Sequence, residues 1–238
     1  MACILNIETS TEVCSVVLSK NGEVVKEKES AEGLNHSKLL SIYIEEIFRE
    51  SDISLGALDA VAVSKGPGSY TGLRIGVSLA KGLCYALDKP LISVGTLDAL
   101  GLYTGRNLDK YLKDIDNISN LLLCPMIDAR RMEVYTALYS REGEQLEDVS
   151  AKIIDSSSFA SWLKDNKILF FGNGAAKSAS VIIHPNALFC GPLKTSARFM
   201  FKLAEKKFEI NDFENVAYFE PFYLKDFIAT VPVKKVIK

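Results

Sequence analysis

One stretch of sequence decides the fold: Ser64-Lys65-Gly66-Pro67-Gly68-Ser69-Tyr70-Thr71-Gly72-Leu73-Arg74-Ile75-Gly76. Before it, residues 58–63 are short, apolar and rich in Val, which predicts a buried β-strand. After it, apolar residues recur every three or four positions, which predicts an amphipathic helix over residues 71–87. A strand, a glycine-rich turn and a helix N-terminus can together hold an anion on backbone N–H groups. However, neither GxxxxGK(S/T) nor GxGxxG is present, so the pattern does not specify a phosphate site.

Small residues occupy one face of the predicted helix, at Gly72, Gly76, Ala80 and Cys84, four positions apart. A glycine inside a helix costs about 0.5–1 kcal/mol relative to alanine, so the pattern indicates that another segment approaches this helix closely. That segment belongs either to a partner protein or to the same domain. The pattern alone leaves both interpretations open.

The composition excludes several classes of protein. With 238 residues the chain can bury a sizeable core, as one large domain or two small ones. Its formal charge of −2 gives no positive field for nucleic acid, so another chain has to supply most phosphate contacts if RNA is involved. The five cysteines are scattered and form no CxxC pair, which argues against a disulfide framework and a zinc site. We recognise no signal peptide and no membrane-spanning run, and therefore expect a reduced, cytoplasmic protein that does not bind membranes.

The two halves of the chain repeat one order of elements. In the first half, strands are predicted at 3–7, 13–19, 23–28, 58–63 and 91–94, and helices at 37–50, 71–87 and 97–106. In the second half, strands are predicted at 121–127, 132–139, 145–154, 168–171 and 188–189, and helices at 156–164, at 196–207 and in a short segment ending at 179. Asn21-Gly22 predicts a two-residue hairpin turn. The polar segment 106–120 is the predicted joint between an N-terminal lobe, 1–106, and a C-terminal lobe, 107–238.

An α/β protein with two similar lobes, each a mixed sheet with flanking helices, resembles the actin/Hsp70/sugar-kinase (ASKHA) superfamily, whose lobes share a cleft. The tail from Asn211 onward is rich in aromatic residues. We therefore expect this tail to pack back on a lobe.

Motifs in this order resemble the TsaB (YeaZ) family over nearly the whole chain. They are Ile4–Ser10, His36-Ser37, Gly66–Gly76, Lys81–Leu83, Asp128–Arg131 with Glu133–Tyr135, and Glu220–Leu224. The resemblance implies a fold similar to that of the catalytic subunit TsaD. It also implies a role in making threonylcarbamoyladenosine in tRNA, at the adenosine next to the anticodon. In that family the chain is a non-catalytic dimerisation subunit, which acts with TsaD and the small ATPase TsaE.

The same resemblance implies that the chain has no catalytic residue and no metal site. The catalytic relative resembles a metalloenzyme with an HxxxH helix motif, whose two histidines, four positions apart, face one metal ion. Thr96 and Leu100 stand at the two matching positions here, and the Leu100 side chain cannot bind a metal. The only histidines, His36 and His184, are too far apart in sequence to rebuild the motif locally. We expect His36 to lie near a helix start.

The nucleotide site of the superfamily is matched only in part. ATPases with this fold place an acid, then Gly and Thr or Ser, in the turn between the first two strands, where the backbone can approach phosphate. Here Ser10 stands where that Gly is expected. The candidate positions, each of which also has a purely structural explanation, are Glu8, Ser10, Thr11, Arg130, Gly172 and Gly174. We expect no cofactor on the isolated chain, and ADP or ATP only at an interface with a partner.

The resemblance further implies a partner surface on two helices of the N-terminal lobe, which would pair with the equivalent helices of TsaD. Its residues would be His36, Leu39, Leu40, Tyr43, Ile47, Tyr70, Thr71, Gly72, Arg74, Ile75, Gly76, Leu79, Ala80 and Leu83. Our hypothesis is that Gly72, Gly76 and Ala80 set how closely the partner approaches. We expect a heterodimer with TsaD, TsaE as a further partner, a homodimer when the chain is alone, and only indirect contact with tRNA. The alternative is an independent ATPase or small-molecule kinase with the same fold.

Overall fold

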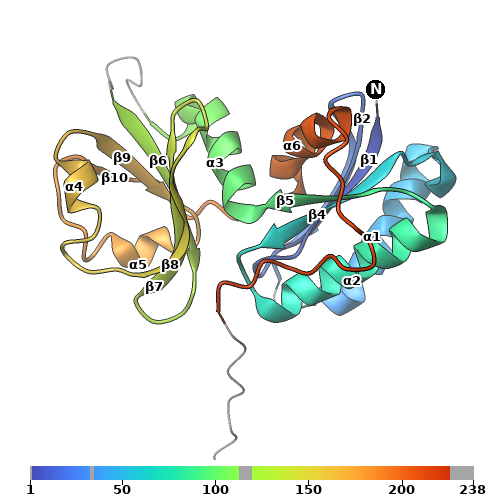
Figure 1. The fold of residues 1–238 in the computed structure, drawn as a ribbon, viewed down its shortest axis with the longest axis horizontal. Helices are drawn as coiled ribbons and strands as arrows, with labels where there is room; N and C mark the ends of the chain where they lie inside the picture. The colour runs from blue at the N-terminus through green and yellow to red at the C-terminus, as the bar shows by residue number, and fades with distance from the viewer. Residues whose placement is uncertain (1, 33–34, 113–119, 226–238) are drawn as a thin grey trace, which may run out of the picture.

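A computed structural model gives the structure of residues 2–32, 35–112 and 120–225, which form two five-stranded mixed sheets (Figure 1). The first sheet has the order β3-β2-β1-β4-β5 and contains β1 (Cys3–Glu8), β2 (Cys14–Lys20), β3 (Glu23–Ser30), β4 (Ala60–Gly66) and β5 (Leu91–Gly95). The second has the order β10-β9-β6-β7-β8 and contains β6 (Leu121–Asp128), β7 (Glu133–Ser140), β8 (Gln145–Ile153), β9 (Lys167–Phe171) and β10 (Ala187–Phe189). Read from β8, the second order repeats the first. The predicted α/β fold of the ASKHA type is confirmed.

The helices cover both faces of the first sheet. The longer helices are α1 (His36–Ser51), α2 (Tyr70–Leu87), α3 (Thr96–Arg106) and α6 (Ala197–Glu209), and the short ones are α4 (Ala160–Leu163), α5 (Ala175–Ser178) and the 3₁₀ turns η1 (Leu55–Ala57) and η2 (Leu108–Lys110). Helices α1 and α2 pack on one face and α6 on the other. Because side chains alternate along a strand, Leu5 and Ile7 of β1 join the core under α1 and α2, whereas Ile4 joins the core under α6.

Most of the predicted elements are confirmed to within a few residues. The hairpin at Asn21-Gly22 is among them: these residues have φ angles of 55° and 76°, and they join the antiparallel strands β2 and β3. The helix predicted at 156–164 is shorter, because Ser157 and Ser158 donate hydrogen bonds to the Asp155 carboxylate instead of capping a helix. This Asx-type turn delays the start of α4 to residue 160.

Two helices pack on the sheet of the other half of the chain. Helix α6 follows the second sheet in sequence but packs on the first, where Met200 and Ala204 lie in one core with Ile4. Helix α3 precedes the second sheet but packs on it, with Leu97 and Leu100 in the core beside β6. The lobe boundary at residue 106 stays a prediction, because α3 packs on the sheet that follows it in sequence and α6 packs on the sheet that precedes it.

Two glycines of α2, Gly72 and Gly76, serve packing inside the chain. A Cβ added at Gly72 would overlap the carbonyl oxygen of Thr9, and one added at Gly76 would overlap the Thr9 hydroxyl. Ala80 is fully buried in the core of the same lobe. The structure therefore corrects the hypothesis that Gly72, Gly76 and Ala80 set the approach of a partner. The close contact is made with the turn that follows β1.

The C-terminal segment packs back on the first lobe, as predicted, over residues 211–225. Glu214 forms an isolated antiparallel bridge with Leu91 of β5, and its carboxylate accepts a hydrogen bond from the Ser93 hydroxyl at 2.5 Å. Val216 and Phe219 pack against the core under α1 and α2. Figure 1 shows this segment, in red, running from α6 along α2 and toward the second sheet. The basic stretch 231–238 lies outside the described residues.

The close packing of α2 predicts opposite effects for two Gly-to-Ala changes in one helix. Gly72→Ala forces a methyl group against the Thr9 backbone, and we expect the free energy of unfolding to fall by about 2–3 kcal/mol. Gly82→Ala adds the same methyl group in open space, and we expect a gain of about 0.5–1 kcal/mol from helix propensity. Urea denaturation followed by circular dichroism measures both. Equal effects of the two changes would contradict this account of the packing.

Candidate functional site

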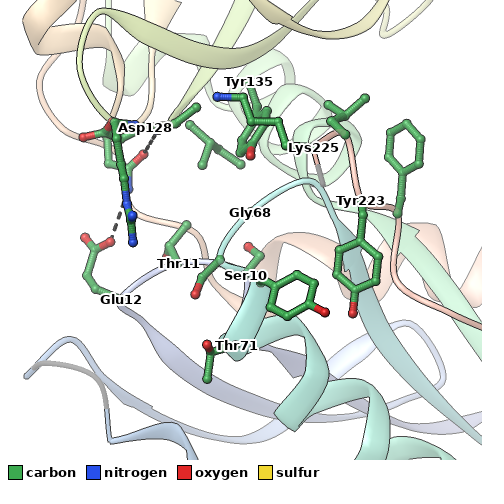
Figure 2. Close-up of a pocket in the computed structure, with 17 residues that line it drawn as sticks. Ser10, Thr11, Glu12, Gly68, Thr71, Asp128, Tyr135, Tyr223 and Lys225 are labelled. Carbon is green, nitrogen blue, oxygen red and sulfur yellow. Dashed lines mark hydrogen bonds between the residues drawn. The ribbon is translucent and has the colours of Figure 1, made fainter. Parts of the chain in front are cut away.

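A cleft of about 570 Å³ opens between the two lobes at the carboxyl ends of β1, β4 and β6. It is lined by residues 10–12, 68–71, 127–130 and 222–225, together with Tyr135 and Asn173. Figure 2 shows Ser10, Gly68 and Thr71 on one side of this cleft and Asp128, Tyr135 and Lys225 on the opposite side. Its position is that of a ligand site in a two-lobed α/β protein.

The turn after β1 is closed by its own hydrogen bonds. The carboxylate of Glu8 is buried and accepts hydrogen bonds from the Ser10 backbone N–H, at 2.6 Å, and from the Ser64 hydroxyl, at 3.0 Å. Burial raises the pKa of Glu8, although these two hydrogen bonds act in the opposite direction. Glu8 therefore lies under the cleft floor and is not among the residues that line the cleft.

The loop before α2 covers this turn. The Ser69 N–H donates to the Ser10 carbonyl at 2.6 Å, and Gly68 lies so close that an added Cβ would overlap the same oxygen. The Ser10 hydroxyl has no hydrogen-bond partner among the described residues, but Ser10 is fully buried. The Ser10 N–H is occupied by Glu8, and the Ser10 carbonyl is covered by the loop, so neither group is open to a phosphate. The residues of the first lobe thus do not fit the phosphate group of the nucleotide that ASKHA proteins hold.

The β6–β7 turn of the second lobe presents charged side chains at the cleft. Arg130 and Arg131 both have positive φ, 71° and 48°, a conformation that costs energy for residues other than Gly, Asn or Asp. Lys177 stabilises the turn, because its ammonium group binds the Asp128 carboxylate at 2.7 Å and the carbonyl oxygens of Arg131 and Glu133. Arg130 lines the cleft, and neither arginine forms an ion pair within the part of the chain that the structure describes.

The Gly172–Gly174 turn packs on β6 and positions Asn173 between the lobes. Gly172 has a φ of 101°, and an added Cβ would overlap the Met126 carbonyl oxygen, so only glycine fits. The Asn173 side chain accepts from the Asp128 N–H at 2.9 Å and donates to Glu12 of the first lobe at 3.2 Å. Gly172 and Gly174 do not line the cleft, whereas Asn173 does.

Of the six nucleotide candidates, the structure brings Ser10, Thr11 and Arg130 to the cleft. Sequence reasoning missed the other polar and aromatic groups that line it, above all Glu12, Tyr135, Asn173, Tyr223 and Lys225. Tyr135 and Tyr223 lie in the motifs Glu133–Tyr135 and Glu220–Leu224, and Asn173 lies between two predicted glycines, but no pattern brought these segments together.

The histidines have structural contacts. His36 is the first residue of α1, as predicted, and its buried ring bonds the Thr11 carbonyl oxygen through Nε2 at 2.8 Å. His184 is exposed and accepts from the Asn186 N–H at 3.1 Å. Thr96 and Leu100 are buried in α3. Among the described residues, no group of three or more His, Cys, Asp or Glu side chains could hold a metal ion.

The residues assigned to a partner surface fall into two sets. The set that is buried inside the chain, and so offers no surface to a partner, is His36, Leu40, Ile47, Gly72, Gly76 and Ala80. The partly buried or exposed set is Leu39, Tyr43, Tyr70, Thr71, Arg74, Ile75, Leu79 and Leu83.

Two of the partner candidates on α1, Leu39 and Tyr43, make contacts within the lobe. Leu39, Tyr43, Glu46 and Glu50 share one side of this helix at three- and four-residue spacing. Glu46 and Glu50 both bind Lys28 of β3, at 3.2 and 2.6 Å. Leu39 and Tyr43 therefore lie toward β3 and pack on the core of the first lobe.

The outer side of α2 carries a different set of small residues from the one predicted. Thr71, Ser78 and Gly82 are exposed there, and no atom lies within 4 Å of a Cβ built on Gly82. Ile75 and Leu79 flank them and are partly buried. This side of α2 has room for the close approach of another helix.

Comparisons with known proteins agree on one family. The family model TsaD, tRNA N6-adenosine threonylcarbamoyltransferase, matches residues 23–232. The chain is 34% identical over 184 residues to the tRNA threonylcarbamoyladenosine biosynthesis protein TsaB of Bacillus subtilis, covering 75% of this chain and 74% of that one. It is 29% identical over 241 residues to TsaB of Haemophilus influenzae, covering 94% and 93% of the two chains.

A solved structure, YeaZ from Pseudomonas aeruginosa, matches the fold with a TM-score of 0.78 at 25% sequence identity. The match covers 94% of this chain and 100% of the YeaZ chain. In the ranges that the structure describes, none of the helices is both long and apolar enough to span a bilayer.

The buried Glu8 predicts a pH-dependent gain of stability for Glu8→Gln. Because its pKa is raised in the folded state, the folded protein keeps this proton at pH values where the unfolded chain has lost it. The contribution of Glu8 to stability is therefore complete below its ordinary pKa and is lost as pH rises through the raised pKa, by up to about 1.4 kcal/mol per pH unit. Gln keeps an oxygen that accepts from Ser10 and Ser64 but does not titrate.

Urea denaturation at pH 5, 6.5 and 8 measures this effect. We expect the free energy of unfolding of Glu8→Gln to rise relative to the unmodified protein as the pH increases. Glu12→Gln, which removes a carboxylate from the cleft surface, is the control for the loss of one charge. Parallel stability curves for Glu8→Gln and the unmodified protein would contradict a buried, proton-binding Glu8.

Proposed function

Because the chain belongs to the TsaB family of tRNA threonylcarbamoyladenosine biosynthesis proteins, we propose that it is a non-catalytic subunit that pairs with a TsaD-type transferase. In this role it supports threonylcarbamoyl transfer to the adenosine next to the anticodon. The match of the TsaD family model to residues 23–232 supports a pairing of two similar folds. Like folds can pair through equivalent helices around a pseudo-twofold axis.

The observation that carries the proposal is the closed turn after β1. Glu8 lies below the cleft floor, the Ser10 N–H is already bonded to Glu8, and Gly68 packs on Ser10. A kinase or ATPase needs this turn open, so that backbone N–H groups can bind phosphate. In this chain the Ser10 N–H and carbonyl are already bonded to Glu8 and Ser69, which suits a partner-binding subunit better than a phosphoryl-transfer enzyme.

The outer side of α2 is the proposed docking surface. Its exposed small residues, Ser78 and Gly82, permit close helix packing, and the neighbouring Ile75 and Leu79 add apolar area. The buried glycines contribute indirectly, because they hold α2 against the turn after β1. In the absence of TsaD, the same surface pairs with a second copy of the chain in an isologous contact.

Further parts of the proposal concern the remaining partners. A TsaE-type ATPase joins the pair, ADP or ATP binds only at an interface with a partner, and this chain contacts tRNA only indirectly. The net charge of −2 supports this last point, since a strong tRNA-binding surface is usually basic. A role in tRNA modification also supports a cytoplasmic location.

The competing function is an independent ATPase or small-molecule kinase. Titration of the purified chain with ATP and Mg²⁺ in a calorimeter separates the two. We expect no binding without a partner, because the loop before α2 covers the phosphate turn. Tight binding by the isolated chain would favour the competing function.

The proposed docking surface predicts that Gly82→Leu abolishes pairing with the TsaD-type subunit. The added side chain projects into open space, so the isolated protein should fold normally, but it holds the partner helix away. We expect at least tenfold weaker binding in size-exclusion and calorimetric assays, and a matching loss of threonylcarbamoyl transfer by the mixture.

The matched control is Gly191→Leu, the same change at an exposed glycine of the second lobe that also has no neighbouring atoms within 4 Å. We expect this variant to bind the TsaD-type subunit as the unmodified chain does. Unchanged co-elution of Gly82→Leu with that subunit would overturn the proposed surface. A transfer reaction by TsaD that is indifferent to the unmodified chain would overturn the proposed function itself.

A further inference from the structure

Residues 214–225, here called the strap, connect three parts of the molecule that are far apart in sequence. At its start, Glu214 bonds to Leu91 of β5 through its backbone N–H, at 2.8 Å. Lys81 of α2 then donates to the carbonyl oxygens of Ala217 and Phe219, at 3.1 and 3.0 Å. A lysine that donates to two backbone carbonyl oxygens of one segment fixes the course of this segment along the helix.

The middle of the strap covers the first turn of α2. The Phe222 N–H donates to the Lys65 carbonyl at 2.7 Å, which adds the strap to the end of β4. The Tyr223 ring packs on the Tyr70 ring with centroids 4.8 Å apart. The guanidinium of Arg74 lies 4.4 Å from the Tyr70 centroid, and its Nε donates to the Tyr223 hydroxyl at 3.4 Å. These aromatic and cation–π contacts hold the strap against the helix.

The end of the strap reaches the second lobe. Lys225 forms an ion pair with Glu133 of β7, and its ammonium group lies 5.8 Å from the centre of the Tyr135 ring. Residues 222–225 form one wall of the cleft (Figure 2). Glu133 also closes the β6–β7 turn, because its N–H donates to the Arg130 carbonyl at 3.1 Å. The strap thus ends on the turn that presents Arg130 to the cleft.

Arg74 connects the strap to the proposed docking surface. Thr71, Arg74 and Ser78 follow one another at three- and four-residue spacing, so they lie side by side on the exposed part of α2. A helix packed over Thr71 and Ser78 has to contact Arg74. Removing water from this guanidinium strengthens its interactions with Tyr70 and Tyr223.

We propose that the strap couples the two lobes. Docking of a partner on α2 strengthens the contacts of Arg74 with Tyr70 and Tyr223, which holds the strap more firmly on α2. The ion pair of Lys225 with Glu133 then restricts the β6–β7 turn as well. The cleft then narrows and Arg130 becomes fixed at its mouth. This inference rests on the proposed docking surface, but it assigns a function to Lys81 and to the Glu220–Leu224 motif that pairing alone does not require. Under this proposal the width of the cleft depends on the partner, although the partner docks on α2 and the cleft lies between the lobes.

Hydrogen exchange of the full-length chain, followed by mass spectrometry with and without a TsaD-type subunit, tests the coupling. In the unmodified protein we expect the partner to slow exchange at least tenfold at the Phe222 amide and at the Glu133 amide. In Lys225→Ala, which removes the ion pair with Glu133 but leaves the backbone hydrogen bond of Phe222, the slowing at Phe222 should persist and that at Glu133 should be lost. Without partner, the Glu133 amide should exchange at least threefold faster in this variant than in the unmodified protein.

Tyr218→Ala is the matched control, because Tyr218 lies in the strap, is 84% exposed and bonds to Asn215 through its backbone N–H, which the substitution keeps. This variant should behave as the unmodified protein. If the partner binds and exchange at Glu133 is unchanged, or is slowed equally in Lys225→Ala, the coupling is overturned while the docking surface stands. If the unmodified chain does not bind the partner at all, the proposed function fails, and the coupling with it. The two failures are therefore distinct.

Discussion

The rest of the structure depends on the contact between the start of α2 and the turn that follows β1. Gly68 and Gly72 approach the Ser10 and Thr9 backbone so closely that no side chain fits between them. This contact sets the direction of α2 and therefore decides which of its faces is buried. It also presses the turn onto the buried Glu8. One packing interaction thus fixes the core of the first lobe, the floor of the cleft and the exposed side of the helix.

The turn after β1 is covered because of this packing, and not because of the single difference at Ser10. Replacing Ser10 by the glycine of the ATPase pattern would leave the Ser69 N–H bonded to the residue 10 carbonyl and Gly68 still packed above it. Glu8 would still be surrounded by the hydroxyl of Ser64 and the backbone of the turn. The loop before α2 therefore covers the residue 10 carbonyl whichever residue stands at that position.

Local periodicity was enough to predict where the strands follow one another along the chain, the Asn21-Gly22 hairpin and the extent of α2. Each of these depends on neighbours in sequence. The exchange of α3 and α6 between the sheets could not be predicted this way. An apolar helix face does not say which sheet it covers, and the contacts of α6 with β1 and of α3 with β6 join segments that are not neighbours in sequence. The same limit applies to the cleft, where Glu12 meets Asn173 and Lys225 meets Glu133. No local pattern joins residues so far apart.

The small residues of α2 illustrate what a helical pattern leaves undecided. Gly76 and Gly82 are six positions apart and therefore point about 120° away from each other on a helix with 3.6 residues per turn. A glycine at either position of a helix favours close approach of another segment, but the sequence does not say which one faces the protein's own backbone. The structure assigns Gly76 to the turn after β1 and leaves Gly82 open. Since the buried glycine fixes the orientation that exposes the other, internal packing and access for a partner are two outcomes of one constraint on this helix.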